Sequence, residues 1–179
     1  MKVFSVIGFS GSGKTTSIEN IIMELKRRGY SVGAVKQCHH RVKTDIDGTN
    51  SDRMRLAGAS LVTAISRDET HVFYQRPLSM SLILSLYDQD FVVLEGSSDI
   101  NVPAIITAQD TAGIDKKLCP GVFAVSGVIA SRLKEYKGYP VICSIKETKK
   151  IVDLIVKTVP EIPQEKFTRI VPEEDKHDY

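Results

Sequence analysis

The sequence has few cysteines and no long apolar run. Its three cysteines, Cys38, Cys119 and Cys143, are widely spaced and form no C-x-x-C pair, so neither a disulfide framework nor a zinc site is predicted. No stretch approaches the roughly 20 apolar residues that cross a bilayer. The first apolar run, at Val3, already belongs to a strand pattern rather than to a signal peptide. We therefore expect a cytoplasmic protein with reduced thiols and no membrane partner.

The sequence also lacks a large excess of charge of either sign. It has 24 Lys and Arg against 22 Asp and Glu, a formal net charge of +2, and the basic residues are evenly spread. A nucleic-acid partner is therefore not predicted. At 179 residues the chain has the size of one domain that needs no structural metal. We expect a single domain over residues 1–179, with an irregular, proline-containing and charged tail from about residue 160.

One motif stands out against this background. Residues 8–15 read Gly-Phe-Ser-Gly-Ser-Gly-Lys-Thr, a complete G-x-x-x-x-G-K-S/T phosphate loop. An apolar strand pattern from Val3 to Ile7 precedes it, and an amphipathic helical pattern from about Thr15 to Arg28 follows it. Because the motif has both its strand and its helix, we predict a nucleotide-binding domain rather than an incidental glycine-rich turn.

The residue types in this loop suit a magnesium-bound triphosphate. The glycines let main-chain N–H groups turn toward a polyphosphate, and the positive end of the following helix dipole points at the same anion. Lys14 is expected to contact the β- and γ-phosphates, and the Thr15 hydroxyl to ligate Mg²⁺. The predicted nucleotide-binding residues are Gly11, Ser12, Gly13, Lys14, Thr15 and Thr16.

The order of the expected elements indicates an α/β fold. A strand–helix–strand unit ending in the strand Ser31 to Lys36 predicts parallel neighbours, and the unbroken apolar run Phe91 to Leu94 predicts a strand buried on both faces. Further strands are expected at 103–107, 121–126 and 139–143, helices at 53–57, 78–87 and 147–158, and an edge hairpin at 60–66 and 71–75. We predict a P-loop NTPase-like three-layer sandwich, with a mostly parallel sheet and an antiparallel edge hairpin.

Two local pairings are expected on the helices. Glu24 and Arg28 are four residues apart and are predicted to pair on the solvent face of the first helix. Ser144 and Glu147 have the spacing of a capping box at the start of the last helix.

A carboxylate for the second half of the site is expected at the end of the buried strand. Asp90 and Glu95 flank that strand, roughly 16 Å apart at about 3.3 Å per residue, so only one of them can lie near the phosphates. Ligands collect at the carboxyl ends of parallel strands, which is the end that carries Glu95. We predict that Glu95 binds Mg²⁺ through water or orients an attacking water, with a solvent-exposed strand-end carboxylate as the alternative.

The polar segment 37–52 has the composition of a long functional loop. Lys36 ends the preceding strand, and His39, His40, Asp45 and Asp47 follow. Adjacent histidines point to opposite faces of an extended chain, so a transition-metal site is disfavoured there. Asp45 and Asp47 alternate and would share one face with Mg²⁺, although acidic turn residues beside a glycine are the plain alternative.

These motifs together resemble the MobB family of molybdopterin-guanine dinucleotide biosynthesis adapter proteins, and the likeness covers most of the chain. In that family a Lys, a paired His and a stretch like D-K-P-G-K-D-S-x-R-x-R-x-A-G-A follow the second strand. The positions of this sequence that match in register are Lys36, His39, His40, Asp45, Gly48, Ser51, Arg53, Arg55, Ala57, Gly58 and Ala59. The positions that depart are Gln37 for His, Arg41 for Asp, Asp47 for Pro, and Thr49-Asn50 for Lys-Asp.

The resemblance implies a GTP-binding homodimer with weak, magnesium-dependent GTPase activity. Its implied role is to assist a separate, MobA-like molybdopterin nucleotidyltransferase, with molybdopterin or its guanine dinucleotide as a further ligand. Lys14 and Glu95 would be the catalytic residues and Thr15, Glu95 and Asp45 the magnesium ligands. The segment that meets substrate or partner would include Lys36, His39, His40, Asp47, Ser51 and Arg53. The chain has no N-K-x-D motif, so guanine preference rests on the resemblance alone.

Two other functional classes fit parts of the pattern. A small-molecule kinase would use Arg132 and Lys134 as a basic lid over the γ-phosphate, although a solvated helix face explains both residues as well. A metal-insertion GTPase would use Cys38, His39 and His40 as its metal-facing group.

Overall fold

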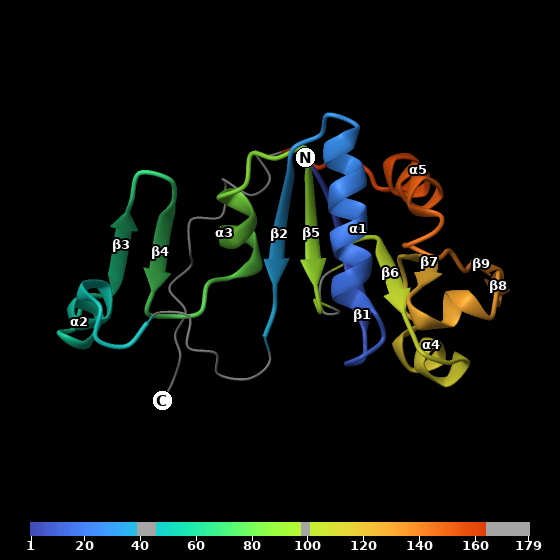
Figure 1. Ribbon diagram of the computed structural model, residues 1–179, viewed down its shortest axis with the longest axis horizontal. Helices are drawn as coiled ribbons and strands as arrows, with labels where there is room; N and C mark the ends of the chain where they lie inside the picture. Colours follow the sequence, from blue (N-terminus) through green and yellow to red (C-terminus); the bar gives the residue numbers. More distant parts are fainter. Residues whose placement is uncertain (39–45, 98–100, 164–179) are drawn as a thin grey trace. The chain divides into compact units, whose positions relative to one another are not determined.

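The computed structural model describes residues 1–38, 46–97 and 101–163 (Figure 1). These residues belong to two compact units. The first contains residues 1–37 and 87–163 without 98–100, and the second contains residues 38 and 46–86. His39, His40 and Asp45, together with most of the predicted tail, lie outside the described residues. The single-domain assignment for residues 1–179 stays a prediction.

The first unit is built on a five-stranded parallel sheet. Its strands are β1 (Lys2–Gly8), β2 (Val32–Lys36), β5 (Phe91–Glu95), β6 (Ala104–Thr107) and β7 (Val122–Ser126), in the order β2-β5-β1-β6-β7. Each adjacent pair runs parallel. The predicted strand at 91–94 is therefore interior, with β1 on one side and β2 on the other, which explains its unbroken apolar run.

Helices cover both faces of this sheet. On one face, α1 (Lys14–Arg27) and α5 (Thr148–Thr158) pack with strand residues such as Phe4 and Ile105. Ile7 and Ile106 lie an odd number of positions from Phe4 and Ile105 along their strands, so their side chains point to the opposite face of the sheet. On that opposite face they share a cluster with α4 (Thr111–Lys117) and the short 3₁₀ helix η1 (Val128–Ser131). The predicted α/β fold with three layers is confirmed.

Four details of the first unit differ from the sequence prediction. The helix α4 was not predicted, although Asp110 caps it by accepting a hydrogen bond from the Gly113 N–H at 2.7 Å. The strand expected at 139–143 is only β9 (Tyr139–Pro140), paired with β8 (Glu135–Tyr136), and Val141 makes a single bridge to β7.

The other two differences concern pairings on the helices. The capping box is wrong because Glu147, not Ser144, is the N-cap of α5, and the Ser144 hydroxyl instead pairs with that of Ser17 at 2.9 Å. The Glu24–Arg28 pair forms, but Glu24 is only 7% exposed rather than on the solvent face. Of the predicted irregular tail only residues 160–163 are described, and there Glu161 makes an isolated bridge to Lys2.

The second unit combines short helices with a hairpin. Its elements are α2 (Asn50–Leu56), β3 (Leu61–Ile65), β4 (Thr70–Tyr74) and α3 (Met80–Ser85). The predicted hairpin forms, but it is a separate two-stranded antiparallel sheet and not an edge of the five-stranded sheet. In the described part of the chain, no helix combines the length and the apolar character needed to cross a membrane.

Candidate functional site

The strand order places the phosphate loop beside the strand that carries the candidate acid. The loop joins β1 to α1, and β5 is the direct neighbour of β1, with Val6 opposite Glu95 in the register. The Gly96 N–H donates to the Val6 carbonyl at 3.1 Å. The turn that follows Glu95 is therefore fixed directly against the strand that leads into the phosphate loop.

The start of α1 is suited to an anion. Its N-cap is Gly13, which has no side chain to accept from the first N–H groups of the helix, and its first turn contains no acidic residue. These N–H groups and the positive end of the helix dipole thus remain available to a phosphate. Lys14, Thr15 and Thr16 form this first turn, and both threonines are exposed.

Lys14 lies folded back over the loop. Its Nζ donates to the carbonyl oxygens of Gly8 and Phe9 at 2.9 Å and 2.8 Å. Partial burial lowers the pKa of the Lys14 ammonium, the Glu95 carboxylate opposes that shift, and Lys117 and Lys36 add to it. A phosphate would replace two neutral carbonyl acceptors with charged oxygens, which make stronger hydrogen bonds.

Glu95 is located at the carboxyl edge of the sheet, as predicted. Its side chain is 16% exposed, and its Oε1 lies 3.5 Å from the Nζ of Lys36 at the end of β2. Asp90 lies at the opposite end of β5, where its Oδ2 accepts from the Ser31 N–H and hydroxyl, both at 2.8 Å. These two hydrogen bonds hold the pKa of Asp90 below its usual value. Asp90 thus anchors the strand start, whereas Glu95 faces the phosphate loop.

Neighbouring strands support the loop from behind. The hydroxyls of Ser12 and Thr107 are 2.8 Å apart, and Thr107 also donates to the Ile7 carbonyl at 3.2 Å. A Cβ on Gly8 would lie 2.2 Å from the Thr107 carbonyl oxygen, so only glycine permits this approach of β1 to β6. Buried hydrogen bonds of Thr107 thus anchor the loop at Ser12 and the strand that leads into it at Ile7.

The remaining predicted site residues belong to the second unit where they are described. Asp47 lies in the turn before α2, Ser51 shares a hydrogen bond of 3.0 Å with Thr49, and Arg53 is exposed on α2. The buried acid of this segment is Asp52, which accepts from the Gly48 N–H and forms an ion pair with Arg55. No sequence motif marks Asp52, which holds the turn and the helix together.

The residues of the two alternative functions are only partly described. Lys134 forms an ion pair of 3.1 Å with Glu147, and Arg132 follows η1 on the surface. Cys38 is exposed, while His39 and His40 lie outside the described residues. Among the described residues there is no group of three or more His, Cys, Asp or Glu side chains that could hold a metal ion.

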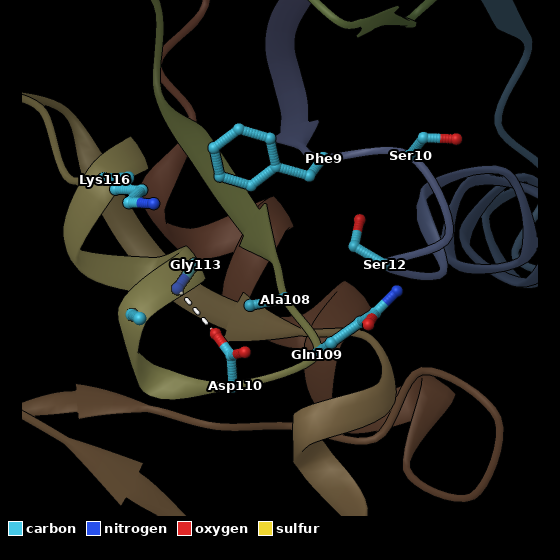
Figure 2. A pocket seen from close by; sticks show the side chains of 9 residues that line it. Phe9, Ser10, Ser12, Ala108, Gln109, Asp110, Gly113 and Lys116 are labelled. Carbon is cyan, nitrogen blue, oxygen red and sulfur yellow. Dashed lines mark hydrogen bonds between the residues drawn. The ribbon is translucent and has the colours of Figure 1, made fainter.

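A pocket of about 280 Å³ adjoins the outer side of the phosphate loop (Figure 2). Three loop residues form one wall, and the segment from the end of β6 into α4 forms the other. The lining residues are Phe9, Ser10, Ser12, Ala108, Gln109, Asp110, Ala112, Gly113 and Lys116. Gln109 and Lys116 were not predicted as site residues, because no sequence motif marks either one and the helix α4 was not expected.

The family model described as "Molybdopterin guanine dinucleotide synthesis protein B", MobB, matches residues 3–127. The chain belongs to the MobB family. The matched region contains the phosphate loop, Glu95 and all five strands of the parallel sheet. The resemblance found in the sequence is confirmed.

Two curated relatives carry related names. The chain is 35% identical over 122 residues to the "putative molybdopterin-guanine dinucleotide biosynthesis adapter protein" of Methanocaldococcus jannaschii, over 64% of this chain and 50% of that protein. It is 32% identical over 109 residues to the corresponding adapter protein of Haemophilus influenzae, over 58% of this chain and 61% of that protein. The matched region thus spans about half of the length of the first relative and about three fifths of the length of the second.

Solved MobB structures share the fold. The crystal structure of Bacillus subtilis MobB superimposes with a TM-score of 0.75 at 21% identity, covering 90% of this chain and 100% of that one. The structure of a MobB homolog from Bacillus stearothermophilus gives a TM-score of 0.67 at 22% identity, covering 88% and 99%. Both comparisons agree with the predicted α/β architecture.

Proposed function

We propose that this chain is a GTP-binding accessory protein of molybdopterin guanine dinucleotide biosynthesis, with weak magnesium-dependent GTPase activity. The observation that carries the proposal is the phosphate loop with Lys14 turned onto its carbonyls and Glu95 on the adjoining strand. This is an arrangement of groups that suits a triphosphate and its metal. Membership of the MobB family and the names of its relatives support the pathway.

The bound nucleotide would be held mainly by the main chain. The N–H groups at the start of α1 would bind the phosphates, and Lys14 would exchange the Gly8 and Phe9 carbonyls for the β- and γ-phosphate oxygens. The Thr15 hydroxyl and, through water, Glu95 would hold Mg²⁺, which neutralises charge on the phosphates. The oxygen ligands of both residues suit this hard cation.

Hydrolysis is expected to be slow. Glu95 is the group placed to orient a water, with its Oε1 3.5 Å from the Nζ of Lys36. No sequence motif identifies an arginine finger. Because an arginine finger supplies a large part of the rate in fast GTPases, we expect slow turnover. A slow GTPase fits a protein whose bound nucleotide controls association with a partner nucleotidyltransferase, which we propose to be MobA-like.

We further propose that the chain acts as a homodimer. One face of the β3–β4 hairpin carries exposed apolar side chains at alternating positions: Leu61, Ile65, Val72 and Tyr74, between 37% and 79% exposed. The other face carries Val62, which is buried. A hairpin that is apolar on both faces has one face left to pack against a partner, and a second copy of the chain is the partner that the resemblance implies.

Calorimetric titration tests the nucleotide site. Wild-type protein is expected to bind GTP, more tightly than ATP, with Mg²⁺ in excess. Lys14→Ala should lose about 100-fold or more in affinity, because about two charge-assisted hydrogen bonds at about 1.5–3 kcal/mol each are removed. The control is Lys26→Ala, which removes an exposed lysine from the same helix and should bind like wild type. The proposal fails if wild type binds no purine nucleotide or if Lys14→Ala binds as wild type does.

A further inference from the structure

Two polar side chains at the carboxyl edge of the parallel sheet are buried without a hydrogen-bond partner. In the part of the chain that the structure describes, the side-chain oxygens in this situation are Oε1 of Gln37 and Oγ of Ser97, and Ser97 is only 1% exposed. Gln37 directly follows Lys36 at the end of β2, and Ser97 lies two positions after Glu95 at the end of β5. An unpaired buried polar group destabilises a fold, so each one in a native protein needs an explanation.

Gln37 points to the face of the sheet that is turned away from α1. Val6, which belongs to the core cluster with α1, is the register partner of Glu95, and Glu95 is in turn the register partner of Lys36. Lys36 and Glu95 therefore lie on the α1 face, where they form their ion pair at 3.5 Å. The Gln37 N–H extends the strand pairing by donating to the Glu95 carbonyl at 3.0 Å. Because side chains alternate along a strand, the Gln37 side chain lies on the opposite face.

Ser97 lies on that same face, beside Gln37. Its carbonyl oxygen accepts from the Ser5 hydroxyl at 2.7 Å, and Ser5 alternates along β1 with Val6, which packs on the α1 side. The chain turns into Ser97 at Gly96, whose φ is +84°, and a Cβ on Gly96 would lie 3.4 Å from the Gln37 carbonyl oxygen. A hydroxyl can donate and an amide oxygen can accept. An unpaired donor and an unpaired acceptor thus lie at the ends of neighbouring strands.

We propose that Gln37 and Ser97 are positioning residues for Glu95, and that the Ser97 hydroxyl donates to the Gln37 amide oxygen when GTP and Mg²⁺ are bound. This inference rests on the proposed function. In the free protein the Glu95 carboxylate pairs with Lys36. On nucleotide binding that carboxylate leaves the ammonium for the water shell of the metal. The main chain then turns at Gly96, so that the donor and the acceptor meet on the other face. Their hydrogen bond fixes this turn and holds Glu95 in its new place.

Urea denaturation of the nucleotide-free protein is the first test. Removing a buried group that has no partner relieves its desolvation and breaks no hydrogen bond. Ser97→Ala and Gln37→Met should therefore unfold at the urea concentration of wild type or at a higher one. The matched control is Ser126→Ala, because Ser126 is 0% exposed but its hydroxyl donates to the Ile142 carbonyl at 2.7 Å. This control should unfold at a lower urea concentration. An equal loss in Ser97→Ala would show that the hydroxyl already has a partner, and would overturn the proposal.

A double-mutant cycle tests the nucleotide-dependent hydrogen bond. The measured quantity is the affinity for the non-hydrolysable GTP analogue GMPPNP, with Mg²⁺ in excess. Gln37→Met and Ser97→Ala should each lose about tenfold, because the bond exists only in the bound state. The double variant should lose the same roughly tenfold and not about a hundredfold, since either change alone removes the bond. Single-turnover hydrolysis at saturating GTP should slow by about the same factor in all three variants, because Glu95 is less well held. Gln75→Met, which alters an exposed glutamine, should match wild type.

The outcomes separate this proposal from the proposed function. If wild type binds GMPPNP but neither single variant loses affinity, or if the two losses multiply in the double variant, the hydrogen bond is wrong and the nucleotide site stands. If wild type binds no GMPPNP, the proposed function is wrong, and the nucleotide-dependent hydrogen bond is wrong with it. Should Gln37→Met fail to fold, Gln37→Leu takes its place in both measurements, because leucine also lacks hydrogen-bonding groups.

Discussion

At the scale of single residues, the two ends of β5 separate a catalytic candidate from a structural carboxylate. Glu95→Gln should retain GTP binding, because the phosphates are held by the loop, but should slow hydrolysis by about 100-fold if the carboxylate orients water. Asp90→Asn is the matched control at the other end of the same strand, where the side chain binds only Ser31. Phosphate release under single-turnover conditions measures both. Unchanged hydrolysis in Glu95→Gln would remove Glu95 from the mechanism.

Glu24 shows what two arginine partners do to a carboxylate that the sequence places on the surface. Arg27 and Arg28 donate to its carboxylate at 2.7–2.8 Å and hold its pKa at about 2. The carboxyl of Glu in an unfolded chain has a pKa of about 4.3. The ion pairs of Glu24 with Arg27 and Arg28 therefore stabilise the fold fully above that pH. The contribution is lost as the pH falls toward 2. Arg28 also reaches Asp153 on α5 at 2.7 Å, which links the two helices.

The free energy of unfolding of Glu24→Gln is compared with that of wild type by urea denaturation between pH 7 and pH 2.5. Near neutral pH the variant should be less stable, because it lacks the ion pairs with both arginines. Below about pH 4 the difference should shrink, because the unfolded wild-type chain then binds a proton at Glu24 that the folded chain, with a pKa of about 2, does not bind. A difference that stays constant over this range would show that the ion pairs do not contribute to the pH dependence.

At the scale of elements, the turn after β7 limits the shape of the phosphate loop. A Cβ on Gly127, whose φ is +87°, would lie 2.2 Å from the Ser12 carbonyl oxygen. Gly138, with φ +82°, has no heavy atom within 4 Å of the same position. Alanine at either residue would be strained in the left-handed backbone conformation, at a cost of about 1–2 kcal/mol. At Gly127 the added methyl group would also collide with the phosphate loop.

Gly127→Ala should therefore be less stable than Gly138→Ala by about 1–3 kcal/mol, the usual cost of overpacking. It should also bind nucleotide more weakly, because Ser12 must shift, whereas Gly138→Ala should bind like wild type. Urea denaturation and titration with a fluorescent GTP analogue measure the two effects. Equal stability and equal affinity of the two variants would contradict a close contact between the turn and the loop.

At the scale of the whole molecule, the exposed face of the β3–β4 hairpin predicts self-association. Ile65 is 79% exposed on that face, and Ile65→Asp would place a charge in an apolar interface, where burial of an unpaired carboxylate is costly. The variant should shift the dimer to monomer, with a dissociation constant at least about tenfold higher. Leu86→Asp is the control, because Leu86 is 62% exposed but lies outside the hairpin. Light scattering over a concentration series measures both variants. A monomeric wild type, or an unaffected Ile65→Asp, would contradict the prediction.

Parts of the fold were predictable from the sequence because their signals are local. The phosphate loop is a contiguous motif, and the apolar runs of β1 and β5 mark interior strands whatever follows them. The helix α4 was missed because it is short and depends on the cap at Asp110 rather than on an apolar period. The last predicted strand was too long because, after Pro140, the chain meets β7 through an isolated bridge at Val141 and hydrogen bonds of Ile142, without forming a strand ladder. The hairpin was recognised, but its separation from the main sheet is not a local property.

The sequence by itself determined that this chain has a phosphate-loop motif, a mostly parallel α/β sheet and the pattern of the MobB family, because each of these depends on residues close together in the chain. Only the tertiary structure decided which distant groups meet. Strand order brings Glu95 and Lys36 to the edge where Lys14 lies, helix packing buries Glu24, and α4 closes a pocket over Phe9. Contacts between segments far apart in sequence depend on how the elements pack, and packing is a property of the whole fold rather than of any motif.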